Sequence, residues 1–201
     1  VYGSTRRFIK EEFPRLDIEY QFYNSRDIAN LENLIKKNTS VIYIETPGTY
    51  TFEIIDIEEV VRVCKKYKLK SIIDNTWATA LYFNPLEFGI DIVIEAVTKY
   101  ISGHSDIMMG AIVANDKNLI NLQRWTKNSG IYVSPDDVYL SLRGLRTLPL
   151  RLKQSSENSF ALAKYLETKK EVKKVIHPAL TQHPEHEKWK KYFNGSSGLF
   201  A

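Results

Sequence analysis

The sequence has little cysteine and no long run of apolar residues. Its single cysteine, Cys64, cannot form a disulfide within the chain, which fits a reducing compartment. No apolar stretch approaches the roughly 20 residues that a membrane-spanning helix needs. The first residues also lack the pattern of a signal peptide. We therefore expect a soluble, cytoplasmic protein with no membrane partner.

A strong excess of one charge sign is also missing. The chain has 28 basic and 24 acidic residues, which are interspersed and form no long basic run. This pattern predicts a solvated surface of mixed charge and no nucleic-acid partner. What the chain does contain is apolar residues, 43% of 201, which is enough to bury a real core.

Strand and helix patterns alternate in the first half of the chain. Residues 41–45 form a short β-branched run that predicts a buried strand, and residues 71–73 predict a second one. Between them, apolar residues recur at helical spacing after Asp56, which is a suitable N-cap. The members of this stripe are Ile57, Val60, Val61 and Cys64. Strand, helix and strand predict an α/β fold with parallel strands and a right-handed crossover.

The second half continues with further elements and then changes in composition. We expect strands at 91–96, 109–114 and 172–176, and helices at 117–127, from Pro135 to about Gly144, and at about 147–168. Ser134 is the expected N-cap of the middle helix. The composition shift near residue 150 predicts two domains, 1–150 and 151–201. Because Val1 lies in a loop pattern and 198–201 opens a strand pattern, we expect a piece of a longer chain.

Two charged residues follow neighbouring strands of the predicted sheet. Asp74 comes directly after the strand at 71–73, and Lys99 follows the next strand. Ligands of parallel sheets gather at the carboxyl ends of strands. Asp74 alone could equally be a turn or capping residue, and a lysine at a strand end is ordinarily a surface cation. Here Lys99 is preceded by Thr98 and followed by small residues up to Gly103, which favours a pocket wall.

Several motifs in this order resemble the Cys/Met-metabolism family of enzymes that depend on pyridoxal 5'-phosphate (PLP). The motifs are Asp74–Ala78, Phe88–Val93, Thr98–Asp106, Arg143–Arg151 and Gly195–Phe200. The resemblance covers essentially all 201 residues, and ordered motifs at matching spacing are far more specific than one short pattern. Segment 45–53 is most similar to the bacterial cystathionine β-lyase branch. Thr49 stands where the usual family pattern has an asparagine, which disfavours the γ-synthase and γ-lyase branches.

The resemblance implies a fold and a set of residue roles. The fold is the aspartate-aminotransferase-like (fold type I) large domain, with a mostly parallel mixed sheet, followed by a linking helix and the start of a small C-terminal α/β domain. Lys99 would bind PLP as a Schiff base, Asp74 would pair with the pyridine nitrogen, and Thr98 would donate to the phosphate. Tyr2 would stack on the ring as a companion of Lys99 in catalysis.

The resemblance also implies a reaction and an assembly. Lys99 would abstract the α-proton of L-cystathionine, and β-elimination would release homocysteine, pyruvate and ammonia, a step of methionine biosynthesis. The family assembly is a homotetramer, a dimer of dimers. Other family residues that bind the phosphate and the substrate carboxylate fall outside these 201 residues. The alternatives are therefore an inactive remnant or non-enzymatic α/β module, and γ-synthase or γ-lyase activity.

Other motifs are weaker. The His183-x-x-His186 spacing could suggest a metal site, but no cysteine or acidic cluster completes it, so we expect a solvated polar loop and no metal. Ser102 or Ser105 with His104 and Asp106 could suggest a hydrolase triad, but they crowd into one loop. Three other side chains have structural interpretations: Trp77 in packing or at a pocket mouth, Tyr100 in the core, and Cys64 buried.

Overall fold

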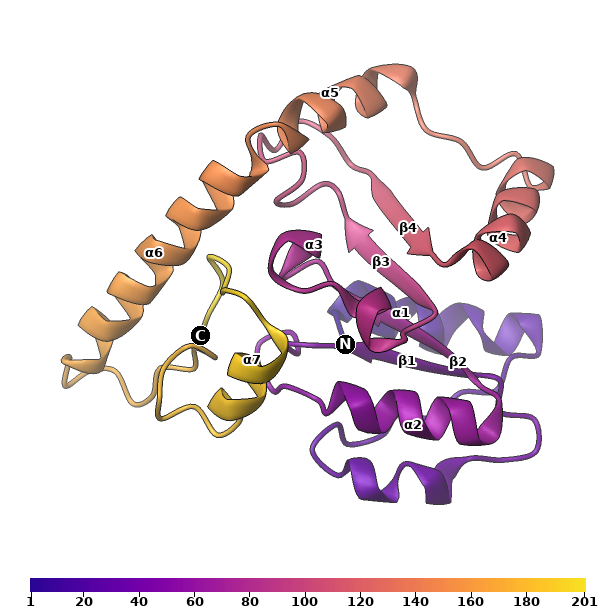
Figure 1. Ribbon diagram of the computed structural model, residues 1–201, viewed down its shortest axis with the longest axis horizontal. Helices are drawn as coiled ribbons and strands as arrows, with labels where there is room; N and C mark the ends of the chain where they lie inside the picture. Colours follow the sequence, from indigo (N-terminus) through magenta and orange to yellow (C-terminus); the bar gives the residue numbers. More distant parts are fainter.

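The computed structural model describes all 201 residues and contains one four-stranded mixed sheet (Figure 1). β1 (Val41–Glu45), β2 (Lys70–Asp74) and β3 (Ile92–Ala96) are parallel, and β4 (Gly110–Ala114) runs antiparallel to β3. The strands lie in the order β1-β2-β3-β4. The four predicted strands at these positions and the predicted mostly parallel mixed sheet are confirmed.

The helix α2 (Ile57–Tyr67) makes the crossover between β1 and β2. The Asp56 carboxylate caps it by accepting a hydrogen bond from the Glu59 N–H at 3.1 Å, as predicted. The apolar stripe of α2 is buried, and burial raises the pKa of the Cys64 thiol to about 11. Cys64 is therefore a packing residue, because a thiol with a raised pKa is a poor nucleophile.

Short helical elements complete the N-terminal half. α1 (Gly3–Glu12) opens the chain, and α3 (Thr79–Tyr82) lies between β2 and β3. Four 3₁₀ turns were not predicted: Pro14–Leu16, Ile28–Asn30, Glu32–Leu34 and Pro85–Phe88. They are too short to show a helical period in the sequence.

Three helices follow β4, and in Figure 1 they lie at the right (α4), the top (α5) and the left (α6) of the molecule. They are α4 (Asp116–Asn128), α5 (Pro135–Leu145) and α6 (Leu148–Glu167). All three match predicted helices, and the Ser134 hydroxyl caps α5 by accepting from the Asp136 N–H at 3.2 Å. We refer to residues 108–150 as the arch.

The C-terminal segment contains only one short helix, α7 (His186–Tyr192). The predicted strand at 172–176 is wrong. Only Ile176 exchanges backbone hydrogen bonds with a partner, Ala201, at 2.5 and 3.0 Å, and a strand needs successive pairs along a ladder. Residue 150 lies in the first turn of α6, so this helix joins the two predicted domains, whose division stays a prediction. No helix is both long and apolar enough to cross a membrane.

Candidate active site

The carboxyl ends of the three parallel strands bring the predicted site residues to one edge of the sheet. Glu45 ends β1 and is paired in register with Asp74, which ends β2. The segment after β2 is fastened to β3, because the Asn75 N–H donates to the Ile94 carbonyl at 2.9 Å and the Ala96 N–H donates to Thr76 Oγ1 at 2.8 Å. Lys99 lies in the turn that follows β3, three residues after its last residue, Ala96. The structure therefore places Asp74 and Lys99 after neighbouring strands.

Asp74 is half-buried and forms no ion pair with a lysine or arginine side chain. Its Oδ1 accepts a hydrogen bond from the Thr76 N–H at 3.0 Å. Burial raises the pKa of the Asp74 carboxyl and outweighs the hydrogen bonds from Thr76, and the nearby Glu45 charge acts in the same direction as burial. A protonated ring nitrogen would supply the missing cationic partner, so this side chain fits the pyridine ring of PLP.

Lys99 lies in a turn and its side chain is exposed, with no hydrogen bond or ion pair. The neighbouring Thr98 hydroxyl is already engaged. Its Oγ1 accepts from the Met109 N–H at 2.9 Å and donates to the Met109 carbonyl at 3.2 Å. Because a hydroxyl has one proton, Thr98 must turn its O–H away from Met109 to donate to a phosphate.

Tyr2 is held at the same edge through Glu45. The Tyr2 N–H donates to Glu45 Oε2 at 2.5 Å, while Tyr2 as a residue is 48% exposed. The other oxygen of Glu45 accepts from the Thr49 N–H at 2.9 Å and from the Thr49 hydroxyl. Glu45 thus joins the start of the chain to the loop after β1. Our sequence reasoning missed it, although its place at a strand end was the signal that identified Asp74.

Two aromatic residues connect the site to the loop at 195–200. The Trp77 indole Nε1–H donates to the Leu199 carbonyl at 3.1 Å, and its ring packs edge-on against Phe193. Trp77 is buried, which supports its packing interpretation. The Tyr100 hydroxyl accepts from the Gly198 N–H at 3.0 Å, so Tyr100 is a half-buried tether and its predicted core position is wrong.

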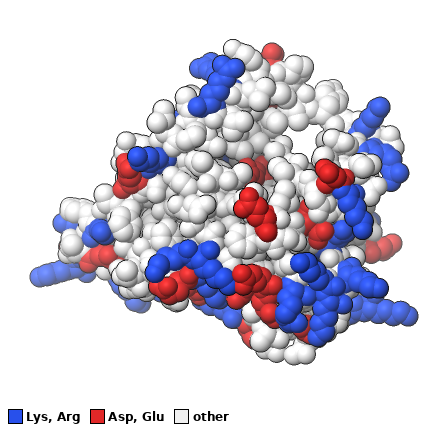
Figure 2. Space-filling view, viewed as in Figure 1, with Lys and Arg blue, Asp and Glu red and all other residues white.

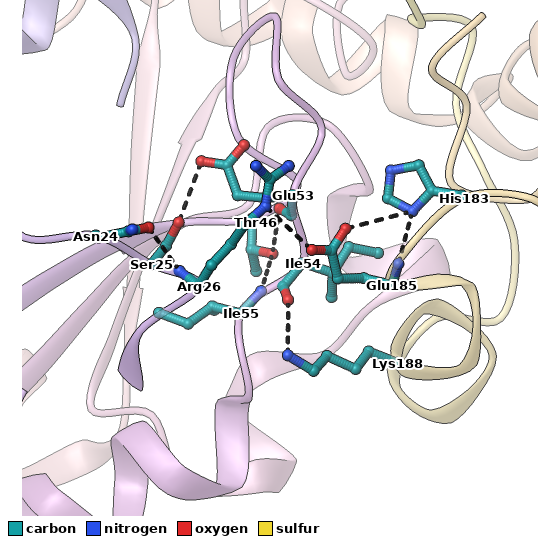
Figure 3. Close-up of polar contacts among 10 residues, drawn as sticks. All are labelled: Asn24, Ser25, Arg26, Thr46, Glu53, Ile54, Ile55, His183, Glu185 and Lys188. Carbon is teal, nitrogen blue, oxygen red and sulfur yellow. Dashed lines mark hydrogen bonds and ion pairs between the residues drawn. The ribbon is translucent and has the colours of Figure 1, made fainter. Parts of the chain in front are cut away.

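The predicted solvated loop at His183 is also wrong, because His183 is buried. Figure 3 shows its imidazole facing Glu185. Its Nδ1 accepts from the Glu185 N–H at 3.2 Å, and burial lowers the pKa of its imidazole. Glu185 in turn binds Arg26 at 3.2 Å. His186 Nδ1 contacts the Pro178 carbonyl at 3.0 Å. The Glu185–Arg26 ion pair therefore joins the C-terminal segment to the N-terminal half, while both histidines bind within their own segment. No group of three or more His, Cys, Asp or Glu side chains is arranged to hold a metal.

Comparisons with known proteins agree on one family. The family model described as "Cys/Met metabolism PLP-dependent enzyme" matches residues 1–201. The chain is 47% identical over its whole length to an L-alanine/L-glutamate racemase of Wolbachia pipientis wMel, covering 49% of that protein. It is 41% identical to a cystathionine β-lyase of Haemophilus influenzae, covering 100% of this chain and 51% of that protein.

A solved structure agrees with the fold. The crystal structure of metB from Corynebacterium glutamicum superposes with a TM-score of 0.95 at 33% identity, covering 100% of this chain and 52% of that one. The predicted fold type I architecture is confirmed by this likeness. The chain spans about half the length of the curated relatives it matches.

Proposed function

We propose that this chain, which belongs to the Cys/Met metabolism family of PLP-dependent enzymes, carries the cofactor-binding core of a carbon–sulfur lyase. The observation that carries the proposal is the placement of Asp74 and Lys99 after neighbouring parallel strands, with Tyr2 held to the same edge. The proposed reaction is β-elimination of L-cystathionine to homocysteine, pyruvate and ammonia.

The residues at the sheet edge suit this chemistry. Bound PLP supplies an electron sink for negative charge that develops at the substrate α-carbon. The Lys99 amine would bind the cofactor and, once released from it, accept the α-proton, a task for which lysine suits because its pKa falls readily on desolvation. The Asp74 carboxylate would hold a proton on the ring nitrogen. Thr98 would orient the phosphate, and the Tyr2 ring would cover one face of the cofactor.

Racemisation is the second candidate, favoured by the 47% identity to a racemase. Both reactions begin with removal of the α-proton and differ in whether a group leaves the β-carbon or a proton returns to the α-carbon. The γ-lyase and γ-synthase reactions are disfavoured by Thr49, whose hydroxyl and N–H both bind Glu45. We also propose a cytoplasmic enzyme that assembles as a homotetramer, a dimer of dimers.

Covalent trapping tests the proposal on the 201-residue protein. PLP is added, borohydride reduces any lysine adduct, and peptide mass spectrometry locates it. We expect the label at Lys99 in the wild type and in the control Lys117→Ala, which removes another exposed lysine, and its loss in Lys99→Ala. A label found on another lysine in the wild type, and retained there in Lys99→Ala, contradicts the assignment of Lys99.

Product analysis then separates the reactions. Pyruvate released from cystathionine supports the lyase, whereas D-alanine formed from L-alanine without pyruvate supports the racemase. Cofactor trapped at Lys99 with neither product identifies the chain as an inactive remnant that retains the binding site.

A further inference from the structure

The position of Lys99 depends on its backbone alone. Its side chain makes no hydrogen bond and no ion pair. Its N–H donates to the Ala96 carbonyl at 3.0 Å, and its carbonyl accepts from the Gly103 N–H at 2.9 Å. The conformation of the loop at 96–104 therefore decides where the Lys99 amine can reach.

Most carbonyl groups of this loop are satisfied within the loop itself. The Val97 carbonyl accepts from the Ser102 N–H at 2.9 Å, and the Thr98 carbonyl accepts from the Ser102 hydroxyl at 3.1 Å. The Ser102 carbonyl contacts His104 Nδ1 at 2.6 Å. The carbonyls of Tyr100 and Ile101 have no such partner, as at the end of a helix whose last carbonyls lack intrahelical donors.

Arg151, which lies in the first turns of α6, supplies both missing donors. Its Nη1 donates to the Tyr100 carbonyl at 2.8 Å, and its Nη2 donates to the Ile101 carbonyl at 3.2 Å. The same guanidinium is fixed from the other side, because Nη2 also donates to the Gly144 carbonyl at 2.8 Å and Nε donates to Thr147 Oγ1 at 2.9 Å. The Arg151 side chain thus links the loop at 96–104 to α5 and to the start of α6.

Two glycines make room for this contact. A Cβ atom at Gly103 would lie 1.8 Å from Arg151 Nη1, and one at Gly144 would lie 2.2 Å from the Ser102 carbonyl oxygen. Gly103 also has φ +71°, which disfavours other residues. Arg151 has no carboxylate partner, and burial lowers the pKa of its guanidinium. All four of its acceptors are neutral oxygens, so Arg151 acts by hydrogen-bond geometry and not by pairing with an opposite charge.

We propose that Arg151 is a positioning residue that holds the loop at 96–104 in the conformation from which Lys99 reaches the cofactor. This proposal rests on the proposed function, because it takes Lys99 to be the residue that binds PLP. The planar fork of arginine can bind the Tyr100 and Ile101 carbonyls together, whereas a lysine ammonium in the same place cannot reproduce that fork.

Three variants test the role of Arg151. Arg151→Met removes the donors, Arg151→Lys keeps the charge without the fork, and Arg146→Met is the control, because Arg146 is exposed and makes no side-chain hydrogen bond or ion pair. Two measurements apply to each: hydrogen exchange of the Ser102 and Gly103 amides without cofactor, and the PLP concentration that half-saturates borohydride trapping at Lys99.

We expect Arg151→Met to speed amide exchange by about tenfold or more and to raise the half-saturating PLP concentration by at least about tenfold, since hydrogen bonds from a charged donor are lost. Arg151→Lys should recover part of both losses, and Arg146→Met should match the wild type. If Arg151→Met is poorly folded by circular dichroism, Thr147→Val provides the milder variant, with an expected change of roughly threefold.

The outcomes separate the two proposals. Trapping at Lys99 that is equal in wild type and Arg151→Met, with unchanged exchange, overturns the role of Arg151 and leaves the proposed function standing. Absence of any trapping at Lys99 in the wild type overturns the proposed function, and the role of Arg151 toward Lys99 falls with it. Changes in both measurements that are confined to the Arg151 and Thr147 variants support the proposal.

Discussion

The layer formed by β1, β2 and α2 differs sharply from the arch in how its apolar residues are used. In the first region, Ile57, Val60 and Ile73 are completely buried. In the arch, Met108 is 89% exposed and Tyr132 is 87% exposed. Both regions have apolar residues at the spacing of their strands and helices. Apolar residues are present in both regions, but only the first region buries them completely.

The difference shows that a local sequence pattern specifies a strand or a helix, but does not specify which other elements pack over it and bury its side chains. β2 has a hydrogen-bonded neighbour on each side, while β4 pairs only with β3, and Ile112 and Val113 of β4 remain about half exposed. Figure 2 shows basic and acidic side chains interspersed along the lower part of the molecule, over α2, in agreement with the expected surface of mixed charge.

The largest difference between the two regions is expected from a matched pair of Ile→Ala substitutions. Ile73→Ala in β2 should lower the free energy of unfolding by about 2–5 kcal/mol, because it leaves a cavity in a closed core. Ile112→Ala in β4 should cost less than about 1 kcal/mol, because water already reaches that side chain. Urea unfolding measures both. Equal losses would show that the arch is as tightly packed as the core.

A smaller effect is expected where the two regions are joined. The Asp91 carboxylate accepts hydrogen bonds from the Ser71 N–H at 3.0 Å and from Asn118 of α4 at 3.2 Å, and it pairs with Lys70 at 3.2 Å. Asp91→Asn replaces one acceptor oxygen by an NH₂ group, which cannot accept a hydrogen bond from these donors. The substitution should lower the free energy of unfolding by about 1–3 kcal/mol at neutral pH. The arch should loosen first, which hydrogen exchange of the α4 amides would detect.

The same variant has a pH signature. Burial alone would raise the pKa of Asp91, but hydrogen bonds from Ser71, Asn118 and Lys70 outweigh it, and the pKa is lowered. A lowered folded-state pKa means that the stabilisation is present above the unfolded pKa of about 4 and is lost as the pH falls through the folded value. The difference in stability between wild type and Asp91→Asn should therefore shrink below about pH 4. A constant difference across that range would contradict the assignment.

The smallest effect compares two helix caps. Asp56 caps α2 and also accepts from the Tyr192 hydroxyl at 2.9 Å, whereas Ser134 caps α5 in the exposed arch with a single bond. Asp56→Ala should cost about 1–2 kcal/mol and Ser134→Ala about 0.5–1 kcal/mol. Thermal unfolding of the two variants measures both. A larger loss at Ser134 would reverse the ranking of the two regions.

Much of the fold could be predicted from the sequence because its elements depend on neighbouring residues. The strands at 41–45 and 71–73 and the caps at Asp56 and Ser134 are local patterns, and the structure confirms each. The segment at 172–176 shows the limit. It has strand-like residues, yet a strand exists only where a partner pairs with successive residues, and here only Ile176 has one.

Some features of the candidate site could likewise be predicted from the sequence, and others could not. The sequence by itself determined the parallel strands and the placement of Asp74 and Lys99 at their carboxyl ends, because periodicity and chain order specify them. Only the tertiary structure decided that Glu45 holds Tyr2 across 43 positions, that Arg151 binds the Tyr100 carbonyl across 51, and that His183 is buried. Such contacts join residues far apart in the chain, so they depend on how whole elements pack, and no local pattern records them.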